Sequence, residues 1–158
     1  MEKQFLNIRW VIDLIERIIN EDIELALIIR GSYVGKDIEF FTPENYSQQL
    51  GYMKRPSGYI IKPHVHLSVS REVQFTNEVL FIKSGKIRVD FYNDEKEYIV
   101  SKILQKGDLV LLAYGGHGFE IIENCEMIEV KQGPYAGEND KERFEPIEHK
   151  FIKYMRSD

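Results

Sequence analysis

Residues 78–112 read EVLFIKSGKIRVDFYNDEKEYIVSKILQKGDLVLL, and this stretch decides the fold class. Short apolar runs are separated by turn-forming pairs, which is typical of antiparallel strands. Over residues 86–92, apolar side chains alternate with charged ones, so the pattern predicts a strand with one wet face and one dry face. We expect a hairpin in which residues 79–82 turn at Ser84-Gly85 into that strand.

The same texture extends over most of the chain from residue 23 onward. Further strands are predicted over residues 23–29, 98–104, 109–112, 119–122 and 126–130. Residues 42–58 and 132–144 carry turn signals and no clear periodicity, so we expect loops there. Many short strands with turns between them predict an all-β sandwich or barrel.

Residues 10–20 are the exception to this texture. Their apolar side chains recur at the spacing of one helix face, at Val11, Leu14, Ile15, Ile18 and Ile19. The spacing predicts one N-terminal amphipathic helix, capped by Asn7, whose apolar stripe covers an edge or end of the sheet.

Composition bounds the class of protein further. The length of 158 residues predicts a single domain, and the net charge of −5 argues against nucleic-acid or anionic-membrane partners. The chain begins with Glu2 and Lys3 and reaches no long apolar run, so we expect neither a signal peptide nor a transmembrane helix. The single cysteine, Cys125, fits a reducing compartment, so we expect a cytoplasmic protein.

A pair of histidines is the first candidate for chemistry. The segment 59–66 has the character of a strand, in which His64 and His66 project to the same face. Two inward imidazoles would repel each other if protonated, and a bound cation satisfies both. His-x-His alone is a weak signal, because paired histidines also occur on exposed strands.

The surroundings of this pair strengthen the metal hypothesis. Gly58 precedes the histidines, and Glu78 follows them with the spacing to Gly85 that a known motif has. Here the chain resembles the cupin superfamily, whose first motif has this order of Gly, His-x-His, Glu and Gly.

Residues 107–117, GDLVLLAYGGH, are similar to the second cupin motif. Three departures stand out. The spacer between His66 and Glu78 is long, Ala113 replaces a proline, and His117 arrives one residue early.

The resemblance implies a single-domain jelly-roll barrel over 1–158. It would have an N-terminal region (1–57), a cupin core (58–131) and a C-terminal loop and tail (132–158). It also implies a divalent cation, Zn, Fe, Ni, Mn or Co, bound by His64, His66, Glu78 and His117. Glu72 in the long spacer is a rival carboxylate, and its distance to Gly85 fits the motif less well than that of Glu78.

For function, the resemblance implies a metal-dependent enzyme acting on a small polar or anionic molecule, with Glu78 or a tyrosine that lines the barrel as the candidate catalytic base. Isomerases, epimerases, dioxygenases and lyases all occur among such cupins. A sugar or sugar nucleotide of polysaccharide biosynthesis is the first expectation. The alternative is a non-catalytic module that binds or senses a small molecule.

Four further side chains are candidates for contact with the ligand: Lys131, Tyr135, Gln74 and Tyr52. An equally open interpretation makes Lys131 an edge-strand residue and Tyr135 a packed surface residue. Asp140, Lys141 and Arg143 are expected to form surface ion pairs, and His149 to be a solvated tail residue. The apolar strand over 23–29 could pair between subunits, so a homodimer is expected.

Overall fold

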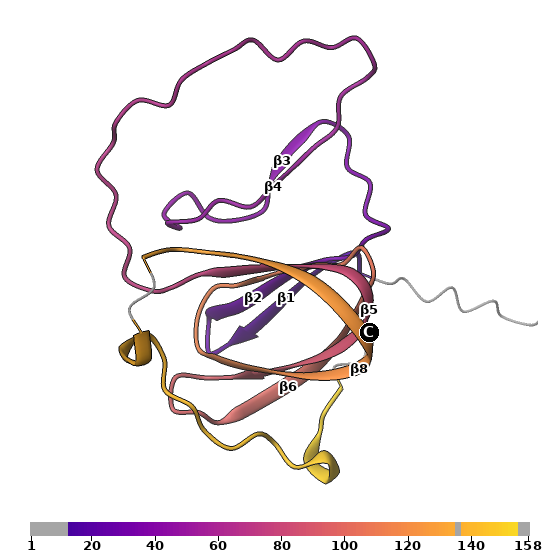
Figure 1. Ribbon diagram of the computed structural model, residues 1–158, viewed down its shortest axis with the longest axis vertical. Helices are drawn as coiled ribbons and strands as arrows, with labels where there is room; N and C mark the ends of the chain where they lie inside the picture. Colours follow the sequence, from indigo (N-terminus) through magenta and orange to yellow (C-terminus); the bar gives the residue numbers. More distant parts are fainter. Residues whose placement is uncertain (1–12, 135–136, 155–158) are drawn as a thin grey trace, which may run out of the picture.

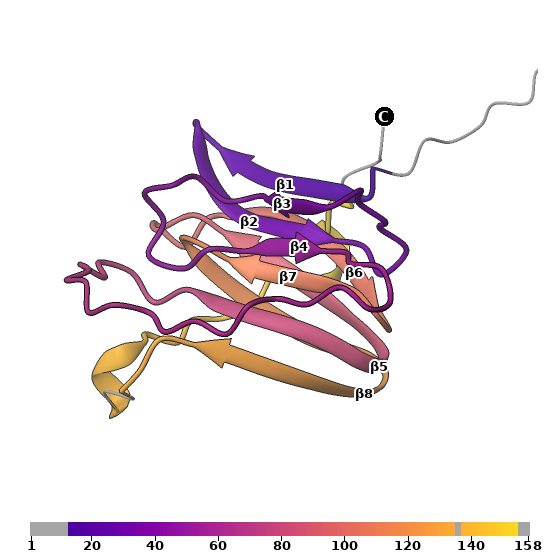
Figure 2. The same cartoon turned by 90° about the horizontal axis from the view of Figure 1, so that it is seen from above.

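The structure is a computed structural model that describes residues 13–134 and 137–154. Six strands of the described residues form one curled sheet in the order β1-β2-β7-β5-β6, with β8 paired to β5, and β3 pairs only with β4 (Figures 1 and 2). The elements are β1 (Ile15–Asn20), β2 (Ile23–Ile29), β3 (Ile38–Phe40), β4 (Gly51–Met53), β5 (Glu78–Tyr92), β6 (Tyr98–Gln105), β7 (Leu109–Leu112), β8 (Gly116–Lys131), and the 3-10 helices η1 (Gly137–Asp140) and η2 (His149–Phe151). The prediction of an all-β protein is confirmed.

The two longest strands produce the curl. β5 pairs with β7 along its first residues and with β6 along its last, while β8 follows it along the other side. The predicted hairpin at Ser84-Gly85 is wrong, because Gly85 has φ +78° and bends β5 without reversing it. The register of β5 against β8 shifts around the same position, so both strands curve together. The two short strands predicted over 119–130 are likewise one strand.

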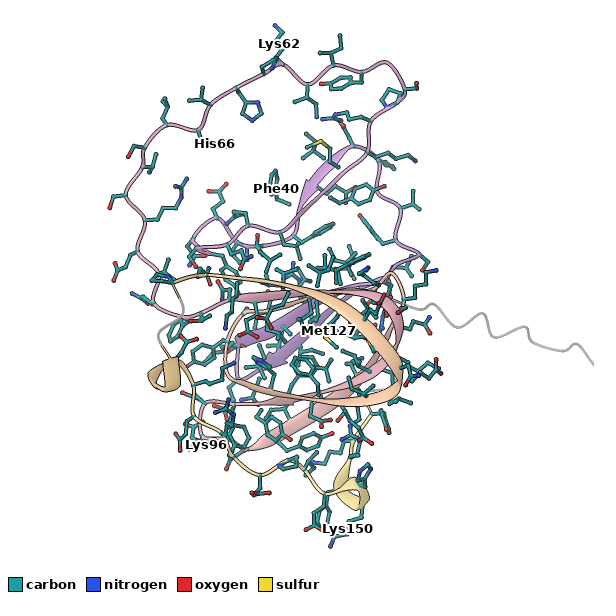
Figure 3. The ribbon with its side chains drawn as sticks, viewed as in Figure 1. Phe40, Lys62, His66, Lys96, Met127 and Lys150 are labelled. Atoms are coloured by element: carbon teal, nitrogen blue, oxygen red, sulfur yellow. The ribbon has the colours of Figure 1, made fainter. Side chains whose placement is uncertain are left out.

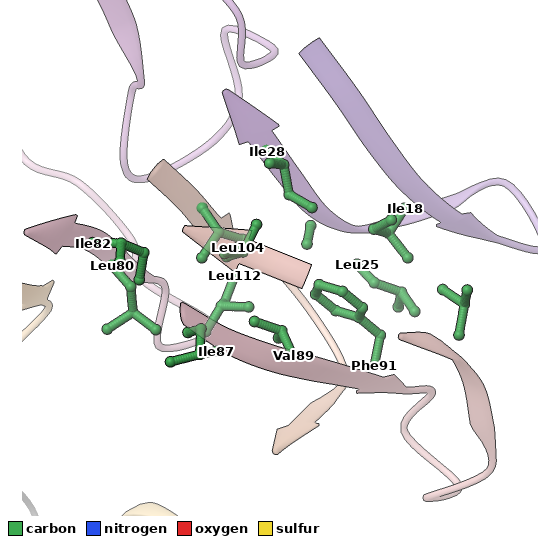
Figure 4. Close-up of a cluster of buried hydrophobic side chains, with 13 residues drawn as sticks. Ile18, Leu25, Ile28, Leu80, Ile82, Ile87, Val89, Phe91, Leu104 and Leu112 are labelled. Carbon is green, nitrogen blue, oxygen red and sulfur yellow. The ribbon is translucent and has the colours of Figure 1, made fainter. Parts of the chain in front are cut away.

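The core fills the concave side of the sheet (Figure 4). It is built from alternate side chains of β5 together with residues of β1, β2, β6 and β7: Ile18, Leu25, Ala26, Ile28, Leu80, Ile82, Ile87, Val89, Phe91, Val100, Leu104, Val110 and Leu112. On the other side of β2 and β7, Phe41, Tyr46 and Leu50 pack against a smaller buried cluster. The sheet is therefore covered on both faces near β7.

The predicted N-terminal helix is absent from the described part of its range. Ile15–Asn20 is strand β1, antiparallel to β2, and residues 10–12 lie outside the described residues. Glu21 and Asp22 connect the two strands with φ of +48° and +67°, the conformation of a tight hairpin turn. β-Branched isoleucines favour such a strand, and pairing with β2 outweighs the helical spacing.

Strand β2 has the predicted bounds and an unexpected position. It lies between β1 and β7, so its backbone is paired on both sides. The edge pairing expected of residues 23–29 is therefore wrong, and the homodimer stays a prediction without that argument. No helix of the described residues is long and apolar enough to span a membrane.

Candidate site at the mouth of the curled sheet

An acid and an imidazole meet where β5 and β8 begin. Glu78 is the first residue of β5 and His117 the second of β8, and His117 Nε2 lies 3.2 Å from Glu78 Oε2. The curl of β8 brings its other end here too, because Lys131 is the register partner of Glu78. Lys131 Nζ lies 3.8 Å from Glu78 Oε1 and 3.7 Å from Asp140 Oδ2. His117 and Lys131, distant in sequence, therefore both contact the Glu78 carboxylate, and Asp140 contacts Lys131 from its other side.

The charge state of Glu78 follows from these neighbours. The His117 imidazole beside it lowers the pKa of the Glu78 carboxyl, burial opposes this effect, and the positive charges of Lys131 and Lys141 add to the lowering. The net pKa is below the ordinary value, so Glu78 is ionised at neutral pH. An ionised, buried carboxylate can accept a proton or bind a cation.

A cavity of about 810 Å³ opens beside this pair. Phe75 packs edge-on against Tyr114 at 4.9 Å between ring centroids, and Tyr92 packs against Phe144 at 5.0 Å. These four rings line the cavity together with the cationic side chains of Lys96, Lys141 and Arg143. Aromatic walls with a few polar groups are typical of small-molecule sites.

The C-terminal segment supplies one wall of this cavity, and its charged residues differ from the expected surface ion pairs. Asp140 faces Lys131 with its side chain 18% exposed, while Lys141 and Arg143 line the cavity. His149 is exposed, as expected, and lies 3.6 Å from Glu120. Sequence reasoning missed Lys96 and Phe144 as cavity residues, since neither belongs to a motif.

The other two predicted metal ligands lie elsewhere. His64 and His66 are exposed on the segment 54–77, which stands away from the sheet (Figure 3). Their rings are 5.3 Å apart, and His64 Nδ1 lies 3.0 Å from the Lys62 carbonyl oxygen. The strand predicted over 59–66 is not formed, and no group of three or more His, Cys, Asp or Glu able to hold a metal occurs among the described residues.

The remaining candidates are divided between the cavity and other places. Gln74 lines the cavity. Glu72 is exposed on the long segment, so Glu78 is the carboxylate that contacts His117. Tyr52 of β4 packs against Tyr33 at 5.3 Å and lines a separate pocket of about 210 Å³. Tyr135 lies outside the described residues.

Asn77 holds Glu78 in place and was also missed. Its Nδ2 donates to the Ala113 carbonyl oxygen at 2.8 Å, and Ser47 Oγ donates to its Oδ1 at 3.1 Å. Its backbone N–H donates to Gln132 Oε1. These hydrogen bonds hold the residue that precedes β5 in place, and they thereby restrain the backbone of Glu78 next to it.

No family model matches the chain, and neither a curated protein nor a solved structure does. The fold and the site together define an all-β protein with a curled sheet and an acid–imidazole pair at its mouth.

Proposed function

We propose that the chain is a metal-binding cupin that takes a divalent cation and a small anionic or polar molecule beside Glu78 and His117. The observation that carries this proposal is the 3.2 Å approach of an imidazole to an ionised carboxylate at the wall of the cavity. This donor set suits Zn, Fe, Ni, Mn or Co. Within the proposal, His64 and His66 supply the remaining imidazoles.

A metal bound there would polarise a carbonyl or hydroxyl, or activate water. The chain's own residues have separate tasks. Lys141 and Arg143 are the groups that would contact an anionic part of the ligand, in a lining that also carries the acidic side chains of Glu78, Asp94, Asp140 and Glu142. The aromatic walls exclude water. Glu78 is the candidate proton acceptor, since its carboxyl is ionised at neutral pH. A sugar or sugar nucleotide is the substrate class to test first, by the cupin resemblance.

Elemental analysis of freshly purified protein, followed by calorimetric titration of the metal found, tests the proposal. Glu78→Gln and His117→Asn should each lower the metal affinity by more than the roughly 10–100-fold that results from losing a residue that only hydrogen-bonds to a ligand. Glu126→Gln is the matched control, because Glu126 is an exposed carboxylate of β8 whose side chain is 72% exposed. Absence of binding in the wild type, or equal affinity in all three variants, contradicts the proposal.

Turnover separates an enzyme from a binder. The metal-loaded protein is screened with sugar nucleotides for isomerisation, and the same products are sought with Glu78→Gln. Turnover that the variant loses supports catalysis. Binding without turnover over the whole screen supports the non-catalytic alternative.

A further inference from the structure

The C-terminal segment of residues 144–154, called the strap below, lies on the outside of the sheet beside β6 (Figure 1). Tyr154 forms a parallel bridge with Ser101 of β6, whose N–H donates to the Lys153 carbonyl oxygen at 2.9 Å. None of the side chains of residues 144–154 is buried. The strap therefore adds little to the apolar core, and local polar contacts hold it in place.

Two tyrosine hydroxyls of the sheet fasten the strap. The Ile147 N–H donates to the Tyr92 hydroxyl oxygen at 3.0 Å, and the Lys153 N–H donates to the Tyr98 hydroxyl oxygen at 2.8 Å. The two tyrosine rings contact each other edge-on, with their centroids 5.7 Å apart. Both fasteners thus lie side by side on the sheet, so a change at one of them is felt at the other.

Tyr92 also joins the strap to the cavity. Its ring lines the cavity and packs edge-on against Phe144, the first residue of the strap, at 5.0 Å between centroids. Phe144 approaches the start of β8 closely, because a Cβ at Gly116 would lie 3.0 Å from Phe144 Cζ. Lys141 and Arg143 directly precede the strap and line the same cavity. The position of the strap therefore determines where this wall of the cavity lies.

The strap neighbours polar groups of the sheet and not its apolar core. Ser101, which it contacts, donates through its Oγ to Asp90. Glu120, which lies 3.6 Å from His149 of the strap, pairs with Arg88. The core fills the opposite, concave side of the sheet. Water can hydrate these hydroxyl and charged groups when the strap leaves, so opening sacrifices little hydrophobic stabilisation and does not require the sheet to unfold.

We infer that the strap opens and docks as one unit on a sheet that stays folded, and that its docking on Tyr92 and Tyr98 completes the wall of the cavity. Tyr92 is then a positioning residue, which acts on the cavity through Ile147 and Phe144. In the open form Phe144 leaves the Tyr92 ring and the cavity loses that wall. The inference goes beyond the proposed function, since it concerns the chain without metal or ligand.

Amide hydrogen exchange of the full chain, in chelator and at several low urea concentrations, tests the strap. Three N–H groups report on it, since each is bonded between strap and sheet: those of Ile147, Lys153 and Ser101. We expect them to exchange at least about tenfold more slowly than in an unstructured chain, with one common protection factor and almost no dependence on urea. The amide of Val89, on β5 between β6 and β8, should be better protected and should respond steeply to urea.

Tyr92→Phe removes one fastening hydroxyl and keeps the ring against the cavity. It should speed exchange about fivefold, the effect of one lost hydrogen bond, at Lys153 and Ser101 as well as at Ile147. Tyr114→Phe is the matched control, because the Tyr114 hydroxyl also belongs to the cavity but donates to a carboxylate of the turn between β5 and β6. That contact is the same whether the strap is docked or open, so the control should leave the three strap amides unchanged.

Phe144→Ala tests the link to the cavity wall, and it should speed exchange of the Ser101 N–H at the far end of the strap. No change at Ser101 in this variant would overturn the link. Exchange of the strap amides at unstructured rates, or with the same urea dependence as Val89, overturns the separate opening, and acceleration of Ile147 alone in Tyr92→Phe overturns the single unit. Because all exchange is measured without metal, a protein that shows the expected pattern but binds no metal contradicts only the proposed function, and metal binding without the pattern contradicts only the strap.

Discussion

Arg88 and Asp90, two residues apart on β5, form a bidentate ion pair on the side of the strand expected to face water. Arg88 Nε donates to Asp90 Oδ1 at 2.7 Å and Nη2 donates to Oδ2 at 2.9 Å. Their side chains are only 6% and 3% exposed. Ser101 Oγ also donates to Asp90, and Glu120 of β8 pairs with Arg88. Hydrogen bonding to Asp90 raises the pKa of Arg88 above its ordinary value although burial opposes it, so the guanidinium stays charged.

Asp90→Asn should lower the free energy of unfolding by about 3–5 kcal/mol, because it leaves the buried Arg88 without its main counter-charge. Urea denaturation measures the change. Glu126→Gln is the control, since it removes an exposed pair with Lys83 at 3.6 Å and should cost less than about 1 kcal/mol. Equal losses of unfolding free energy in the two variants would show that the buried ion pair stabilises the fold no more than the exposed one.

Alanine substitutions at Gly85 and Gly137 distinguish the backbone strain of a positive φ from the steric clash of an added Cβ. Both have positive φ, +78° and +74°. A Cβ at Gly85 would lie 2.0 Å from the Asn124 carbonyl oxygen, whereas one at Gly137 would have no atom of the described residues within 4 Å. Gly137→Ala should therefore cost only the backbone strain, about 1–2 kcal/mol, and Gly85→Ala clearly more. Thermal melts of the two variants compare them, and a smaller loss for Gly85→Ala would contradict the bend assigned to β5.

The sequence predicted the strands whose apolar residues face the core, because alternation reports directly on one buried face. It failed where a charged residue is buried with a partner. In the sequence, Arg88 and Asp90 have the pattern of side chains that face solvent. Ser101 and Glu120 on the neighbouring strands offset the desolvation cost of burying them, by a hydrogen bond to Asp90 and an ion pair with Arg88. It also failed at Ile15–Asn20, where isoleucines fit both a helix stripe and a strand.

For the candidate site, two of the four ligands predicted from the motif spacing, Glu78 and His117, lie 3.2 Å apart, and their role as metal ligands stays a prediction. The same spacing did not reveal that Lys131 faces that carboxylate or that Asp140 pairs with Lys131, since these contacts depend on the curl of β8 and on the path of the C-terminal segment. The strand predicted over 59–66 failed for another reason: a local pattern does not encode which strand a segment pairs with, and His64 and His66 lie exposed on an unpaired segment.

Glu16 predicts a pH dependence of stability. Burial raises the pKa of its carboxyl, but hydrogen bonds and charge from Lys102 and Arg30 outweigh it, and the net pKa is lowered from 4.5. Lys102 Nζ donates to Glu16 Oε2 at 2.5 Å and Arg30 Nε to Oε1 at 2.6 Å. A lowered folded-state pKa stabilises the fold above the unfolded value, and this contribution disappears as pH falls through the folded value.

Glu16→Gln should therefore be less stable than the wild type at pH 7, and the difference should shrink as the pH falls below about 4.5. Denaturant midpoints at a series of pH values measure it. Glu145→Gln is the control, because Glu145 is exposed, and its difference from the wild type should stay small throughout. A stability difference between Glu16→Gln and the wild type that grows as the pH falls would contradict a lowered folded-state pKa of Glu16.

Chelator should lower the melting temperature of metal-loaded protein. A ligand that binds only the folded state stabilises it by about 2.7 kcal/mol when free metal is at a hundred times Kd. For a domain of this length that corresponds to a shift of roughly 5–11 °C.

His64→Ala should abolish the chelator response while leaving the metal-free melting temperature nearly unchanged, because the His64 side chain is exposed. His149→Asn, which changes an exposed histidine outside the site, should keep the full response. A wild-type curve indifferent to chelator, in protein shown beforehand to contain metal, would remove the energetic case for the site. A response retained by His64→Ala but lost in His117→Asn would confine the metal to the mouth of the sheet and exclude the long segment from its ligands.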